Sequence, residues 1–158
     1  MKHIPGKVKF LVCVDSSEEC KVALKFACMR AKNSGGEVIL LYVIEPSDLQ
    51  HFAGVEQLIK KEAIEKAEEV MNNLIESVLK DFNLKVKSVI SHGDTYGKIK
   101  DLINLDKTIS ILVLGEAPEG VGTNYLVNKF STGLTKSIHI PLTIVPGNLT
   151  DKELKKIT

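Results

Sequence analysis

The sequence has 158 residues, of which 44% are hydrophobic and 26% are charged, and its formal net charge is +1. This composition is typical of one globular domain, and a charge so close to zero argues against nucleic acid and membrane surfaces as partners. Three cysteines without a framework spacing argue against a disulfide-stapled secreted domain. The N-terminal residues form no apolar signal segment, and no apolar run reaches the roughly 18 residues of a membrane span. We therefore expect a cytoplasmic protein.

Short apolar, β-branched segments alternate along the chain with segments of helical periodicity. In chain order, we expect strands over residues 8–14, 38–44, 86–90, 109–114 and 142–145. These are near-continuous apolar runs, as strands covered on both faces require. We expect helices that begin at Ser16-Ser17, cover residues 56–80 and 96–105, begin after Thr123, and begin at Thr150. Residues 46–54 are expected to form an irregular connection.

Local signals support these helix boundaries. Ser16 with Glu19, and Thr150 with Glu153, have the spacing of a capping box. Gly35 marks the end of the first helix, because glycine adopts the left-handed turn that stops a helix. The alternation of strands and helices predicts parallel strands joined by right-handed crossovers. The fold class is therefore α/β: a single three-layer, doubly wound domain over residues 1–158, with a five-stranded parallel sheet. Its core covers about residues 7–146, and residues 147–158 form a tail with a short helix.

A ligand of such a sheet binds beyond the carboxyl ends of the strands, where the winding direction switches. If the first and fourth strands are neighbours, two corners meet there: Val14-Asp15-Ser16 and Leu114-Gly115. Val43, at the end of the second strand, is expected close by. Two interpretations of Asp15 stay open, because its carboxylate can accept from a ribose hydroxyl or adenine amino group, or can cap the first helix.

The loop that follows Gly115 has the position of a phosphate cradle. Gly120 and Gly122 can form a nest of backbone N–H groups, but Pro118 has no N–H to donate. The acidic Glu116 and Glu119 place negative charge close to the expected phosphates. The composition favours an ordinary Gly/Pro connection over a strong phosphate site.

The cysteines and histidines offer weaker signals. Cys20 lies in the first turn of a helix, where the helix dipole favours a thiolate, whereas burial as an unreactive side chain is the plainer interpretation. Cys13 is expected to pack as a small hydrophobe. The four histidines lack metal-ligand spacing, so no metal site is expected.

Five short segments, in chain order, carry a family resemblance. They are VCVDSSE at residues 12–18, LLYV at 40–43, HGD at 92–94, ILVLG at 111–115 and IPLTIV at 140–145. Over about residues 7–146 this ordered set resembles universal stress proteins. It matches their first strand with its acidic turn, their second strand, a Gly-Asp turn, their fourth strand with a terminal glycine, and their closing strand.

The ATP-binding branch of that family carries a G-x2-G-x9-G-(S/T) signature. In an ungapped alignment with this signature, Gly115 aligns with the first glycine and Pro118 with the second. Asn128 and Lys129 take the third glycine and its hydroxyl residue, and Ser131 lies just beyond. Side chains at positions where backbone approaches phosphate hinder close contact. Lys129 can pair with phosphate as a point charge or be a solvated surface lysine. This departure from the family's signature implies weak or absent ATP binding.

We expect a stress-response regulatory or binding protein that is at most a weak ATPase. No cofactor is required, and ATP or another adenine nucleotide is the candidate ligand. The last strand is short and bounded by prolines, as sheet edges tolerate, and in the resembling proteins it pairs across a two-fold axis. We therefore expect a homodimer through Leu142, Thr143, Ile144 and Val145, with further protein partners that the sequence does not identify.

Two alternatives remain open. One is an ATP-binding member with slow hydrolysis, in which Asp15, Val43 and Gly115 bind the nucleoside while Lys129 and Ser131 bind phosphate. The other is a thiol-based redox sensor that uses Cys20.

Overall fold

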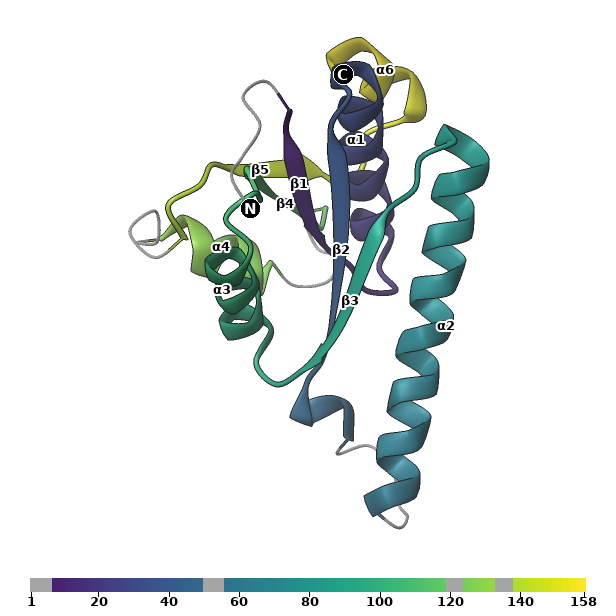
Figure 1. The fold of residues 1–158 in the computed structure, drawn as a ribbon, viewed down its shortest axis with the longest axis vertical. Helices are drawn as coiled ribbons and strands as arrows, with labels where there is room; N and C mark the ends of the chain where they lie inside the picture. The colour runs from purple at the N-terminus through teal and green to yellow at the C-terminus, as the bar shows by residue number, and fades with distance from the viewer. Residues whose placement is uncertain (1–6, 50–55, 119–123, 133–137) are drawn as a thin grey trace.

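Five parallel strands form the centre of the molecule (Figure 1). A computed structural model of the chain describes residues 7–49, 56–118, 124–132 and 138–158. The strands are β1 (Lys9–Cys13), β2 (Glu37–Ile44), β3 (Lys87–His92), β4 (Ile111–Glu116) and β5 (Leu142–Pro146). The helices are α1 (Glu18–Ser34), the 3-10 helix η1 (Pro46–Leu49), α2 (Glu56–Phe82), α3 (Thr95–Leu105), α4 (Tyr125–Ser131) and α6 (Asp151–Ile157).

The strand order β3-β2-β1-β4-β5 confirms the predicted α/β fold with a five-stranded parallel sheet. β1 pairs with β2 on one side, where Val12 lies opposite Leu40, and with β4 on the other, where Val12 lies opposite Val113. The chain therefore winds outward in two directions from β1 and β4. Their carboxyl ends form the crevice that this topology offers to ligands.

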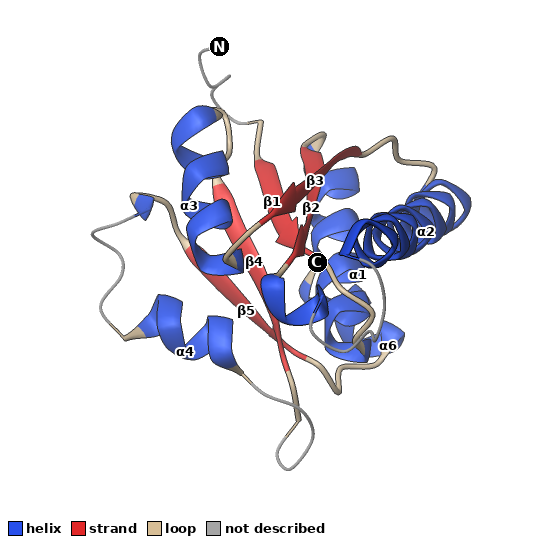
Figure 2. Ribbon diagram, turned by 90° about the horizontal axis from the view of Figure 1, so that it is seen from below, coloured by secondary structure: helices blue, strands red, loops and turns tan. Residues whose placement is uncertain are grey.

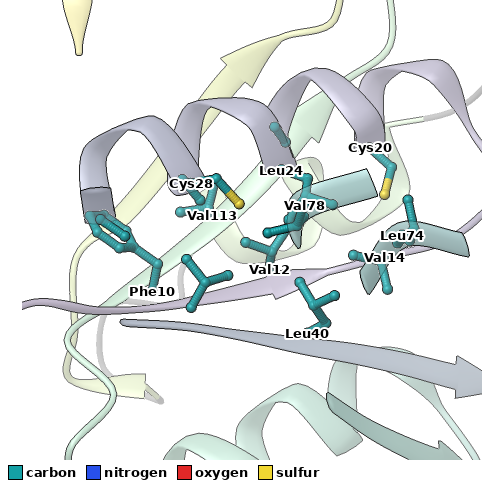
Figure 3. Close-up of a cluster of buried hydrophobic side chains, with 14 of the residues drawn as sticks. Phe10, Val12, Val14, Cys20, Leu24, Cys28, Leu40, Leu74, Val78 and Val113 are labelled. Carbon is teal, nitrogen blue, oxygen red and sulfur yellow. The ribbon is translucent and has the colours of Figure 1, made fainter. Parts of the chain in front are cut away.

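Helices cover both faces of the sheet, because alternate side chains of a strand point to opposite faces. α1, α2 and α6 lie on one side and α3 and α4 on the other (Figure 2). On β1, Phe10 and Val12 belong to the apolar cluster beneath α1 and α2, whereas Leu11 belongs to the cluster beneath α3 and α4. Figure 3 shows the first cluster, in which Cys20 and Cys28 of α1 pack as hydrophobic side chains.

The helix boundaries follow from capping, with one correction to the sequence prediction. Ser17, not Ser16, caps α1, since its side chain accepts a hydrogen bond from the Cys20 N–H at 3.2 Å. Gly35 ends α1 at φ 67°, as predicted. Thr150 and Glu153 form the predicted capping box at the start of α6, with both reciprocal bonds present.

Strand pairing explains where the observed strands differ from the predicted ranges. β3 continues to His92 because Ile44 and His92 pair across β2 and β3. β4 continues to Glu116 because that residue pairs with Pro146 of β5. Of the predicted connection at 46–54, η1 forms the described part, and the rest lies outside the described residues. Within the described ranges, no helix combines the length and apolar character needed to cross a membrane.

Candidate functional site

A cavity of about 380 Å³ lies at the carboxyl ends of β1, β2 and β4. Six of the residues proposed from sequence line it: Val14, Asp15, Ser16, Val43, Leu114 and Gly115. The structure brings them together because β1 lies between β2 and β4, so that all three strand ends open to the same side. The prediction that the two corners after β1 and β4 meet is therefore confirmed.

Asp15 occupies the turn between β1 and α1. Its carboxylate accepts a hydrogen bond from the Ser17 N–H at 2.7 Å, which is an Asx-turn leading into the helix. Asp15 is exposed, and an ionised carboxylate offers about four acceptor positions. The local bond uses one of them, so this helix-start role leaves Asp15 free to accept hydrogen bonds from a ligand.

Gly115 lies where the first turn of α1 comes closest to β4. A Cβ atom added at Gly115 would stand 2.4 Å from the carbonyl oxygen of Glu19 and 2.7 Å from its carbonyl carbon. Gly147, just after β5, faces the same residue, and a Cβ there would lie 2.6 Å from the Glu19 Cβ. Both glycines thus permit the close approach of α1 that shapes one wall of the cavity.

The opposite wall contains polar side chains that the sequence analysis did not single out. Glu45 follows β2, and it accepts hydrogen bonds from the Thr95 N–H at 3.2 Å and from the Thr95 hydroxyl. Tyr42 and Lys66 line the same cavity. Glu45 had a usable signal, because it follows a buried strand as Asp15 does. Lys66 had none, since it is one of many charged residues on α2.

Asn124 closes the cavity on the side of α4. Its side-chain amide accepts from the Ala117 N–H at 2.7 Å and donates to the Ala117 carbonyl at 3.3 Å. This pair of bonds links the end of β4 to the start of α4 across residues 119–123, which lie outside the described residues. The predicted nest residues Gly120 and Gly122 are among them.

The remaining predicted phosphate contacts, Asn128, Lys129 and Ser131, are not among the residues that line the cavity. The Lys129 ammonium donates to the Tyr125 hydroxyl at 2.8 Å and lies 4.6 Å from the centre of the Tyr96 ring. This hydrogen bond to the Tyr125 hydroxyl raises the pKa of Lys129. Ser131 donates to the Asn128 carbonyl at 3.3 Å. In α4, Ser131 thus bonds to the helix's own backbone, whereas Lys129 contacts Tyr125 and also Tyr96 of α3.

Of the two interpretations of Cys20, the structure supports burial as an unreactive side chain rather than a thiolate favoured by the helix dipole. Cys20 is 4% exposed, and burial, with the nearby Asp15 carboxylate, raises its pKa to about 12. Burial raises the pKa of Cys28 to about 12 as well, and that of Cys13 above its usual range. Because thiolates are the reactive form, these thiols are held in their unreactive state. Within the described residues, no group of three or more metal-ligating side chains is present.

Solved structures of universal stress proteins share this fold. The chain resembles universal stress protein UspA from Lactobacillus plantarum, with 20% identity, coverage of 87% of this chain and 97% of that chain, and a TM-score of 0.67. It resembles an Arabidopsis thaliana family protein with AMP bound, at 19% identity, 92% and 94% coverage, and a TM-score of 0.58. It also resembles an Archaeoglobus fulgidus universal stress protein in complex with dAMP, at 13% identity, 89% and 98% coverage, and a TM-score of 0.61.

Comparison with the curated proteins gives no match. The model of the universal stress protein family matches residues 8–146, which is most of the chain and runs from the residue before β1 to the last residue of β5. The sequence match and the shared fold agree over this range. The chain therefore belongs to the universal stress protein family.

Proposed function

We propose that this chain is a regulatory binding protein whose cavity binds an adenine nucleoside or nucleotide weakly. The observation that carries the proposal is the position of the cavity, where the corners after β1 and β4 meet beside Val43. Asp15 supplies a carboxylate acceptor there, and Val43 supplies an apolar surface for a base. The complexes of two family members with AMP and dAMP support a ligand of this chemical class.

Several features support weak rather than tight binding of polyphosphate. Pro118 has no N–H to donate to an anion. Lys129 is engaged by the Tyr125 hydroxyl and the Tyr96 ring. The hydrogen bond uses one of the three donors of the ammonium group, and Lys129 is not among the residues that line the cavity. We therefore favour a binding protein over the alternative of an ATP-hydrolysing member.

The chemistry of the cavity also supports binding rather than catalysis. The cavity thiols of Cys13 and Cys20 have raised pKa values, chiefly because of burial. The carboxylates of Asp15 and Glu45 accept hydrogen bonds from Ser17 and Thr95. These bonds hold the cavity's carboxylates in fixed orientations, which suits recognition of a ligand's donors.

Titration calorimetry with AMP and ATP tests this function. Asp15→Asn keeps an oxygen for the Ser17 N–H but removes the negative charge, so we expect AMP to bind about tenfold more weakly, since hydrogen bonds to charged groups are stronger. Asp151→Asn, on α6 away from the cavity, is the control and should bind as the unmodified chain does. An ATP dissociation constant on the order of 1 µM in the unmodified chain would contradict the proposal.

We further propose that the chain acts as a homodimer through β5, by way of Leu142, Thr143, Ile144 and Val145. β5 is at the end of the strand order, so one of its edges has no strand partner within the described residues. Leu142, Thr143 and Ile144 are half-buried, whereas Val145 is 2% exposed and belongs to the core. Unpaired strand edges invite pairing with a second chain.

Light scattering of Ile144→Glu tests the dimer. We expect a monomer, because a charge at the edge opposes strand pairing. Leu105→Glu places the same charge at an apolar residue that is 84% exposed at the end of α3, and it should remain dimeric. Thermal melting of both variants checks that the fold is intact. A folded Ile144→Glu that stays dimeric would refute this assignment.

A further inference from the structure

The side chains that line the cavity carry more negative than positive charge. Among the described lining residues, three carry carboxylates, Asp15, Glu19 and Glu45, and one carries an ammonium group, Lys66. Each phosphate group added to a ligand brings further negative charge, and like charges repel across a partly enclosed cavity more strongly than in open water. This lining therefore disfavours a ligand with many phosphates.

Lys66 contributes a positively charged group to the lining of the cavity. α2 contacts β2 and η1, which brings Lys66 to the side of the cavity formed by the end of β2. Lys66 is exposed and forms no ion pair with a described carboxylate. By contrast, Lys61 on the same helix pairs with Glu65 at 4.0 Å. The Lys66 ammonium is thus available to a ligand.

One of the cavity carboxylates, that of Glu45, already accepts hydrogen bonds from the protein. Glu45 accepts two hydrogen bonds from Thr95, one from its N–H and one from its hydroxyl. These donors fix the Glu45 carboxylate and offset part of its charge. An anion in the cavity therefore meets a weaker repulsion from Glu45 than a carboxylate without these donors would exert.

From this arrangement we propose that the cavity selects a nucleoside monophosphate over a triphosphate, and that Lys66 binds the single phosphate group. This inference rests on the proposed function, because it assumes that an adenine ligand enters the cavity. It assigns the phosphate contact to α2, whereas the signature comparison placed it on Lys129 of α4. Lys129 stays with Tyr125 and Tyr96 and takes no part in binding.

Calorimetric titrations of the full chain with adenosine, AMP and ATP test the proposal. We expect AMP to bind more tightly than ATP. In Lys66→Gln we expect AMP affinity to fall about tenfold while adenosine affinity changes less than about twofold, because only AMP carries the group that a charge-assisted hydrogen bond would hold. Lys61→Gln removes the same charge from the same helix outside the cavity, and it should match the unmodified chain.

The outcomes distinguish a failure of the Lys66 proposal from a failure of the proposed adenine site. Binding of adenosine with ATP preferred over AMP overturns the selectivity. An unchanged AMP affinity in Lys66→Gln, or equal losses for adenosine and AMP, overturns the role of Lys66 while leaving the adenine site in place. Absence of binding by all three ligands overturns the proposed function and this inference with it.

Discussion

Replacement of Asp106 by asparagine should destabilise the protein through one buried lysine. Lys9, at the start of β1, is 7% exposed. Its ammonium donates to the Asp106 carboxylate and to the Thr108 hydroxyl, the latter at 3.0 Å. Asp106 also accepts from the Thr108 N–H at 3.0 Å. Burial opposes ionisation of Asp106, but the bonds from Lys9 and Thr108 outweigh it and lower its pKa to about 2.

The magnitude follows from that shift. The pKa of Asp106 falls from 3.8 to about 2 on folding, and one pKa unit corresponds to about 1.4 kcal/mol, so the ionised group contributes about 2 kcal/mol at neutral pH. Because the folded pKa is depressed, this contribution is complete well above the unfolded pKa. It is lost as the pH falls through the folded pKa. Asp106→Asn also leaves the buried Lys9 without its charged partner, so we expect a total loss of about 3 kcal/mol at pH 7.

Urea unfolding at pH 7 and pH 3 measures this effect. At pH 3 the unfolded carboxyl is largely protonated, so the difference between Asp106→Asn and the unmodified chain should shrink by about 1 kcal/mol. Asp101→Asn is the control, since Asp101 is 73% exposed and lies 4.0 Å from Lys98. A loss at pH 7 no larger than that of the control, or a difference of equal size at both pH values, would refute the reasoning.

Two further substitutions and one labelling experiment test how the chain packs. Gly115→Ala should cost about 2 kcal/mol in thermal or urea unfolding, because its Cβ would meet the Glu19 backbone; a neutral effect would contradict this close approach. Leu154→Ala in α6 should cost about 3 kcal/mol, because Leu154 is 0% exposed, whereas Ile157→Ala on the same helix, 56% exposed, should cost much less. Maleimide labelling at pH 7 should modify Cys20 slowly in the folded protein and rapidly in urea, because burial keeps its thiol protonated; rapid labelling of folded protein would revive the sensor hypothesis.

The fold was predictable because its strands are buried on both faces. In a chain where helices alternate with strands, a near-continuous apolar run such as residues 38–44 indicates a strand that is buried on both faces of a parallel sheet. The position of Asp15 and Gly115 in one cavity was predictable from the topology alone, because parallel neighbouring strands end at the same edge of the sheet. The cap of α1 was misplaced by one residue, because Ser16 and Ser17 are equally good caps by composition and tertiary placement chooses between them.

The surroundings of the other candidate side chains depend on contacts between segments distant in sequence. Lys129 is held by Tyr96, a residue of α3, so the α4 sequence alone could not show its engagement. Lys66 belongs to the cavity because of where α2 passes the end of β2. The burial of Cys20 did have a signal, since Cys20, Ala23, Leu24, Ala27 and Cys28 recur at helical spacing and are all buried on one face of α1.

The claim on which the account depends is that the strand-end cavity is the ligand site. Two-dimensional amide NMR of the full chain during titration with AMP tests this most directly. We predict saturable shifts of the Val14, Val43 and Gly115 amide signals, because these residues lie at or just after the ends of the three strands that meet at the cavity. Shifts confined to other surfaces, or no shifts at millimolar AMP, would contradict the account.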